Sequence, residues 1–242
     1  ALEVEPAFHV RQDVLRGLPF SALQGRFAEV MGAGYSVSAF TDWRGDEVQQ
    51  LWIKSKVLIP SGAVQGAPGG GCWGAVAASG QVHPIEGGPP ESCTAQGGEP
   101  GPWHERLPHF RPEFTPSHGE ELQSEYFVPV HHAPAALRAV RALAGRLAPL
   151  LLVSEVRTVA ADNLWLSPCY GQNSAALHFT WRREEAALRR LLPALEAALE
   201  PHGARPHWGK VFTTPPERLR ALYPRFPDFA RLLRQLDPGG KF

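Results

Sequence analysis

One order of elements occurs twice along the chain, on either side of a glycine-rich and proline-rich segment. Before that segment, extended residues from Leu2 to about Leu18 precede a helical pattern over Pro19–Gly32 and two strand patterns, Tyr35–Trp43 and Gln49–Ile59. After it, the same order returns with a strand, a helix and two strands over Glu121–Val130, Ala133–Leu147, Pro149–Ala160 and Asn173–Trp181. We therefore predict an α+β fold, in which two similar lobes form one large antiparallel sheet with helices packed on one face. The opposite face would be free to line a site.

The segment over residues 60–120 holds about half of the 24 glycines. We predict that it is a loop insert and not a packed element. Its "GAPGGG" run, Gly66–Gly71, is not followed by GK[ST] or by a clear helix, so it is no phosphate loop. Beyond the second lobe we expect a helix over residues 183–203, a short extended stretch over 204–212 and two small helices, Pro216–Tyr223 and Phe226–Gln235.

The charge and cysteine content narrow the class of protein. The formal net charge of +0 argues against nucleic acid as the main partner, because phosphate binding normally shows as a basic excess. No apolar run is long enough to span a bilayer. Three widely spaced cysteines fit free thiols in a reducing compartment, so we expect a cytoplasmic protein. The opening "ALEVEPAFHV" has neither an initiator Met nor an apolar signal core, and we expect the chain to be part of a longer protein.

A charged pair lies in a strand that otherwise looks built for burial. In "LLLVSEVRTV", Glu155 and Arg157 are two positions apart, so we expect them to share a face that also carries Leu151 and Val153. Taken alone, such a pair is most often a structural ion pair on a solvated face.

Two further strands carry polar residues at alternating positions. In "ALHFTW", His178 and Thr180 form a polar face opposite an apolar one, and in "ELQSEYF", Gln123 shares a face with Glu125 and Phe127. His178 alone could equally be a satisfied, half-buried histidine. Neighbouring strands would bring these groups together with Glu155 and Arg157, which is a donor and acceptor set for a polyhydroxylated ligand. The scattered histidines lack metal-ligand spacing, so no metal is predicted, and no G-x-S-x-G marks a serine hydrolase.

The runs "SEVRTVAADNLWLSPCYGQNSAALHFTW" and "RPHWGK" resemble the alditol oxidase and sugar-1,4-lactone oxidase group of FAD-linked enzymes. The resemblance extends over the chain except for the glycine-rich insert. It implies that residues 1–242 are the substrate domain, a cap of the vanillyl-alcohol-oxidase type with the 60–120 insert. An N-terminal FAD-binding domain would be a separate part that this chain lacks, and the cofactor would be bound mainly there.

The resemblance also implies roles for individual residues. Lys210 would lie beside the flavin ring, Arg157 near the reacting carbon, and His178 would be a base for the hydroxyl proton. Substrate hydroxyls would be bound by Glu155, Thr180 and Gln123. The implied reaction oxidises the terminal C–OH of a polyol such as xylitol or sorbitol, with O2 giving H2O2, and the isolated chain would be inactive. An aldonolactone oxidase and a non-catalytic carbohydrate-binding module are the alternatives.

Overall fold

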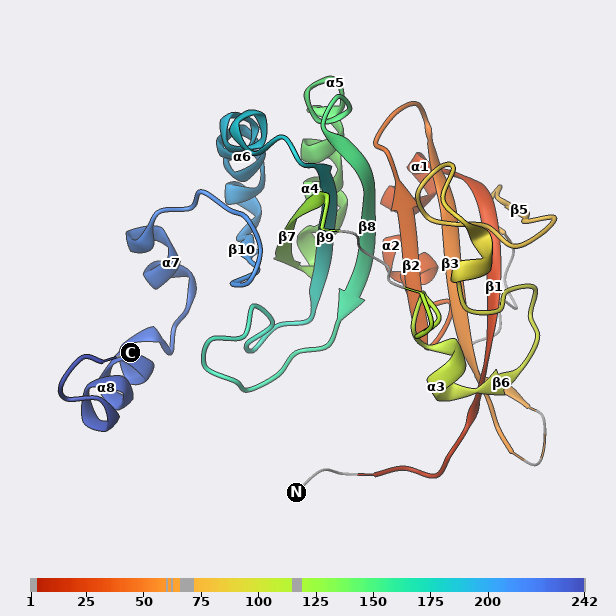
Figure 1. Cartoon of the computed structure of the whole chain (residues 1–242), viewed down its shortest axis with the longest axis horizontal. Coiled ribbons are helices and arrows are strands. Elements are labelled where there is room, and N and C mark those ends of the chain that lie inside the picture. The colour runs from red at the N-terminus through yellow and green to blue at the C-terminus, as the bar shows by residue number, and fades with distance from the viewer. Residues whose placement is uncertain (1–3, 60, 62, 66–71, 115–118, 242) are drawn as a thin grey trace.

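A computed structural model describes residues 4–59, 61, 63–65, 72–114 and 119–241. Its centre is a ten-stranded sheet with the order β10-β7-β9-β8-β2-β3-β1-β5, which β4 and β6 join at β3 and β1 (Figure 1). The strands are β1 His9–Pro19, β2 Ser36–Thr41, β3 Glu47–Val57, β4 Val64–Gln65, β5 Val76–Ala77, β6 Gly101–Pro102, β7 Glu121–Pro129, β8 Leu151–Val159, β9 Ser174–Arg182 and β10 Arg205–Pro206. All of the paired strands are antiparallel.

The two predicted lobes are present and meet through corresponding strands. In the first lobe the order across the sheet is β2-β3-β1, and in the second it is β8-β9-β7. Each lobe contributes its second strand to the junction, where β2 and β8 pair antiparallel with Ala39 opposite Val156. The two lobes thus meet through equivalent strands and form a single continuous sheet.

Helices cover one face of this sheet and form the main core with it. They are α1 Phe20–Gly25, α2 Phe27–Met31, α4 Ala133–Arg141, α5 Ala144–Leu147 and α6 Glu185–Leu199. Figure 1 shows α1, α2 and α4 behind the sheet. Trp43, Phe179 and Trp181 are buried at this face, where the two tryptophans each stack on Phe179. The single helix expected over Pro19–Gly32 is two short ones, because the backbone leaves helical geometry at Arg26, just after Gly25, a poor helix former.

The prediction that the insert is not a packed element was wrong. Residues of the insert form η1 Pro90–Ser92 and α3 Trp103–Arg106, and they cover the second face of the first lobe, with α3 in front of the sheet in Figure 1. There Cys93 completes a second core with Phe40 and Trp52. These large apolar side chains point away from the helices and need a cover, which explains why the insert packs. The Gly66–Gly71 run lies outside the described residues.

The C-terminal part runs along the edge of the second lobe. The remaining helices are η2 Val130–His132, η3 Glu200–His202, α7 Pro216–Leu222 and α8 Phe226–Leu236, and the last two match the expected pair. Of the extended stretch expected over 204–212, only β10 is a strand, paired with β7. Among the described residues, no helix has both the length and the apolar character needed to cross a membrane.

Candidate active site

The candidate site lies on the sheet face opposite the helices, over the second lobe. An irregularity in β8 sets its composition: Leu151 pairs with Trp181 and Val153 with Thr180, so Leu152 is an extra residue, a β-bulge. Leu151 therefore joins the main core, whereas Val153 joins the second one. The expectation that Leu151 shares a face with Glu155 was wrong, because the bulge reverses the alternation. Glu155 and Arg157 therefore lie on the face of the sheet opposite to Leu151.

Strand pairing brings the predicted polar residues together. His178 of β9 is flanked by Glu125 of β7 and Glu155 of β8 in one row across the sheet. The next row holds Gln123 opposite Thr180, and Arg157 lies one row in the other direction, opposite Ala176. All five sequence-predicted residues on these strands thus share one face.

Glu125 is the anionic centre of the site, a role that the sequence reasoning missed although it placed Glu125 on the right face. Its two oxygens accept bonds from Arg157 Nη2 at 2.6 Å and Lys210 Nζ at 2.8 Å. The Glu125 side chain is 2% exposed. Burial raises the pKa of its carboxyl group, but Arg157 and Lys210 outweigh that effect, and the pKa lies below its usual value. Glu125 is therefore a carboxylate that holds two cations.

Glu155 is likewise charged and almost fully enclosed. Its Oε1 lies 3.1 Å from His109 Nε2 and its Oε2 lies 3.5 Å from Arg157 Nη1. Burial acts to raise the pKa of Glu155, yet His109 and Arg157 lower it to about 2. Both carboxylate oxygens face protein groups, so this residue is arranged to orient Arg157.

His178 forms the neutral part of the site. Its Nε2 lies 3.2 Å from Gln123 Oε1, an acceptor, so Nε2 carries the proton and Nδ1 remains an acceptor. Burial, supported by the positive charge of Lys210, lowers the pKa of His178 to about 4. Thr180, which is 9% exposed, lies in the adjacent row.

Backbone pairing along the edge of β7 places Lys210. His207 N donates to Glu125 O at 2.9 Å and Val211 N donates to Gln123 O at 2.8 Å, so the "HWGK" segment is held at both ends. An open groove borders Lys210 and Gln123 here and reaches Trp208, whose residue is 41% exposed. The side of the site next to Lys210 is therefore accessible.

The structure adds two residues that the sequence reasoning did not select, His109 from the insert and Lys54 from β3. Lys54 Nζ lies 3.3 Å from His109 Nδ1, and the two connect the first lobe to Glu155. No local pattern marks this contact, because residues 54, 109 and 155 are far apart in sequence.

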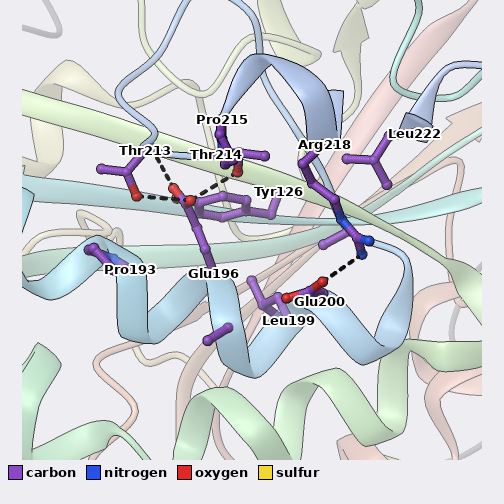
Figure 2. Close-up of a pocket in the computed structure, with 12 residues that line it drawn as sticks. Tyr126, Pro193, Glu196, Leu199, Glu200, Thr213, Thr214, Pro215, Arg218 and Leu222 are labelled. Carbon is purple, nitrogen blue, oxygen red and sulfur yellow. Dashed lines mark hydrogen bonds and ion pairs between the residues drawn. The ribbon is translucent and has the colours of Figure 1, made fainter. Parts of the chain in front are cut away.

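A second cavity, of about 300 Å³, lies on the opposite side of β7 between α6 and α7 (Figure 2). Its carboxylates are already occupied: Glu196 accepts from Tyr126, Thr213 and Thr214, and Glu200 pairs with Arg218. This cavity contains none of the residues predicted for the site. Its carboxylates bond to the chain segment after Lys210 and to α7, so they have a structural role.

Comparison with known proteins identifies a family and several relatives. Residues 119–242 match the family model described as D-arabinono-1,4-lactone oxidase. An alditol oxidase of Streptomyces sp. (strain IKD472 / FERM P-14339) is 50% identical over 241 residues, which are 100% of this chain and 56% of that protein. An L-gulonolactone oxidase of Scyliorhinus torazame is 34% identical over 91 residues, 36% of this chain and 21% of that protein.

An L-gulono-1,4-lactone dehydrogenase of Mycobacterium tuberculosis (strain ATCC 25618 / H37Rv) is 32% identical over 124 residues, 50% of this chain and 28% of that protein. The chain thus spans about half the length of the alditol oxidase and less of the other two. The family model covers slightly more than half of the chain, including every site residue predicted from the sequence. The chain belongs to the D-arabinono-1,4-lactone oxidase family.

Proposed function

We propose that this chain is the substrate domain of an FAD-dependent oxidase that converts the terminal C–OH of an alditol, such as xylitol or sorbitol, to an aldehyde, with O2 as the acceptor. The alditol oxidase that is 50% identical over the whole chain supports this substrate class. A separate FAD-binding domain of the same protein would carry the cofactor and would close over the polar face.

The observation that carries the proposal is the pair of cations on one buried carboxylate. Glu125 fixes Arg157 and Lys210 side by side, and the two side chains keep 37% and 16% of their surface exposed. A flavin ring gains negative charge when it accepts two electrons from a substrate. Two fixed, partly exposed cations are the donor set that stabilises such charge, so the residues present fit the cofactor.

Each site residue then has a defined task. Lys210 would lie against the flavin ring, and Arg157 would hold the substrate oxygen in place with its planar fork of donors. His178, neutral at physiological pH, would take the hydroxyl proton on Nδ1 as the C–H bond breaks. Gln123 and Thr180 would bind neighbouring hydroxyls. We assign Glu155 to orienting Arg157, since its side chain is only 8% exposed.

Oxidation of a sugar 1,4-lactone is the second candidate function. It is favoured by the description of the matching family and by the gulonolactone oxidase and dehydrogenase relatives. Because a lactone also presents adjacent ring oxygens and hydroxyls, the same donor and acceptor set would bind it. The two functions differ in their preferred substrate and not in the residues used.

A peroxide-release assay on the FAD-loaded full-length protein tests the proposal. Xylitol and sorbitol should give H2O2 with a higher kcat/KM than 1,4-lactones, and Lys210→Met should abolish most of this activity while flavin stays bound. Lys56→Met, a change of a lysine on β3 that pairs with Glu5, is the matched control. Preference for lactones would select the second function, and sugar binding without peroxide would select a non-catalytic carbohydrate-binding module.

A further inference from the structure

Lys54 is a buried lysine that connects the insert to the sheet. The residue is 1% exposed, and its ammonium group lies 2.5 Å from Leu107 O and 3.1 Å from Pro108 O. Its third contact is His109 Nδ1 at 3.3 Å. These three acceptors satisfy all three N–H donors of the ammonium group. Through them Lys54 holds both the backbone at Leu107 and Pro108 and the imidazole of His109.

This arrangement determines the tautomer of His109. Burial lowers the pKa of Lys54 to about 7, although the nearby charge of Glu155 acts to raise it. Below that pH Lys54 is an ammonium group, which can only donate, so Nδ1 of His109 accepts and the ring proton lies on Nε2. Nε2 lies 3.1 Å from Glu155 Oε1 and 3.4 Å from Ser38 Oγ, and the shorter contact is to the carboxylate. His109 therefore donates to Glu155.

Packing fixes the plane of the His109 ring as well. Phe40 and Trp52 contact it edge-on, with ring centroids 5.5 Å and 5.3 Å away. Rotation of the His109 ring away from Glu155 is thus opposed by the Lys54 contact at Nδ1 and by the packing of two aromatic rings against it. If the lysine served only to attach the insert, the two backbone carbonyls would suffice. The ordered imidazole is an additional feature, and it points at the site.

We propose that Lys54 and His109 are positioning residues of the active site: Lys54 sets the tautomer and orientation of His109, and His109 holds Glu155 so that Glu155 orients Arg157. The contacts run in an alternating series from Lys54 through His109, Glu155, Arg157 and Glu125 to Lys210. The glycine-rich insert would thereby contribute to catalysis without touching substrate. The kinetic part of this proposal rests on the proposed oxidase function.

Histidine NMR on the purified protein tests the positioning directly. Long-range proton–nitrogen spectra at pH 6 should show His109 as a single tautomer with the proton on Nε2, with signals assigned by their loss in His109→Gln. Lys54→Met should release the ring and average its nitrogen signals. A proton on Nδ1 in the wild type, or unchanged His109 signals in a folded Lys54→Met, would overturn the proposal. This measurement needs no catalysis, so it stands even if the oxidase function is wrong.

Kinetics of the FAD-loaded full-length enzyme test the consequence for the site. His109→Phe keeps the aromatic packing and removes the donor, so kcat should fall about tenfold or more with little change in KM. His109→Gln can still donate to Glu155 and should stay within about threefold of wild type. His104→Gln, at an exposed insert histidine, is the control. Equal losses in the Phe and Gln variants, or no loss in His109→Phe, would contradict a positioning role.

Discussion

Arg157 donates to Glu125 over 2.6 Å, whereas its contact with Glu155, two residues away on its own strand, is 3.5 Å. The stronger partner is thus on β7, across β9. The ion pair that stands out in the sequence is the weaker of the two contacts, and Glu125, shared with Lys210, organises the cationic side of the site.

Replacement of Glu125 should destabilise the fold. Glu125→Gln removes the counter-charge of Lys210 and the nearer of the two counter-charges of Arg157, which keeps only Glu155 at 3.5 Å. We expect the free energy of unfolding to fall by about 2–3 kcal/mol, somewhat below the cost typical of fully buried pairs, because both cations are partly exposed. Urea unfolding measures this change. Glu120→Gln removes an exposed partner of Arg183 and should cost less than about 0.5 kcal/mol. Similar losses in the two variants would show that Glu125 is not an anchor.

Arg157 should be needed for the reaction more than for the fold. Arg157→Ala removes the donor fork next to the substrate, and kcat/KM for xylitol should fall about 10²–10³-fold, as when other preorganised donors are removed. Steady-state peroxide release measures the loss. Arg183→Ala, which removes a surface guanidinium paired with Glu120, is the matched control. A kcat/KM near that of the wild type would assign Arg157 a structural role only.

Much of the architecture was predictable, because it depends on local pattern. Period-two alternation located the long strands, and the repeated order of elements indicated two lobes. On β9, alternation also placed His178 and Thr180 on one face, opposite the buried Phe179. These features need only residues that are close in sequence.

Two kinds of feature were beyond that reasoning. One extra residue, Leu152, reverses the alternation in β8, and nothing in "LLLVSEVRTV" indicates where a strand will bulge. The contacts of Glu125 with Lys210 and of Glu155 with His109 join segments 85 and 46 residues apart, so they depend on the folded arrangement. The packing of the insert was also missed. It depends on contacts with distant strands, and the apolar residues of the insert are few and widely spaced.

The stability of the protein should depend on pH through His178. Its pKa is about 4 in the folded state, through burial and the charge of Lys210, against an unperturbed 6.5. Between these values the unfolded state binds more protons, so the stability present above pH 6.5 is lost as the pH falls towards 4. Between pH 7.5 and 4.5 this loss is about 2–3 kcal/mol.

Urea unfolding of His178→Gln at the two pH values measures that contribution. The variant should lose less stability than the wild type between pH 7.5 and 4.5, by about 2–3 kcal/mol. His104→Gln, at an exposed histidine, should follow the wild-type curve. Parallel pH dependences of the wild type and His178→Gln would refute the assignment of a neutral, buried imidazole.

Glu196 should control how firmly the segment after Lys210 is held. Its carboxylate accepts bonds from Tyr126 OH at 2.9 Å, Thr213 N at 2.7 Å, and the Thr213 and Thr214 hydroxyls at 2.9 Å each (Figure 2). Glu196→Ala would leave the hydroxyl of Tyr126, a residue only 1% exposed, without its acceptor, and we expect a loss of about 2–4 kcal/mol. Hydrogen exchange should reveal a local effect: the Val211 amide, bonded to Gln123 O, should lose protection.

The neighbouring Glu200 supplies the control for this prediction. It lines the same cavity, but among the described residues its only ion pair is with Arg218, at 3.1 Å, and both side chains are substantially exposed, at 57% and 41%. Glu200→Ala should therefore change stability by less than about 1 kcal/mol and leave protection at Val211 unchanged. If Glu196→Ala lowers global stability but Val211 exchanges as in the wild type, the carboxylate supports α6 alone. Loss of protection confined to residues 211–214 would instead mean that Lys210 owes its place beside Glu125 to a carboxylate on the opposite side of the sheet.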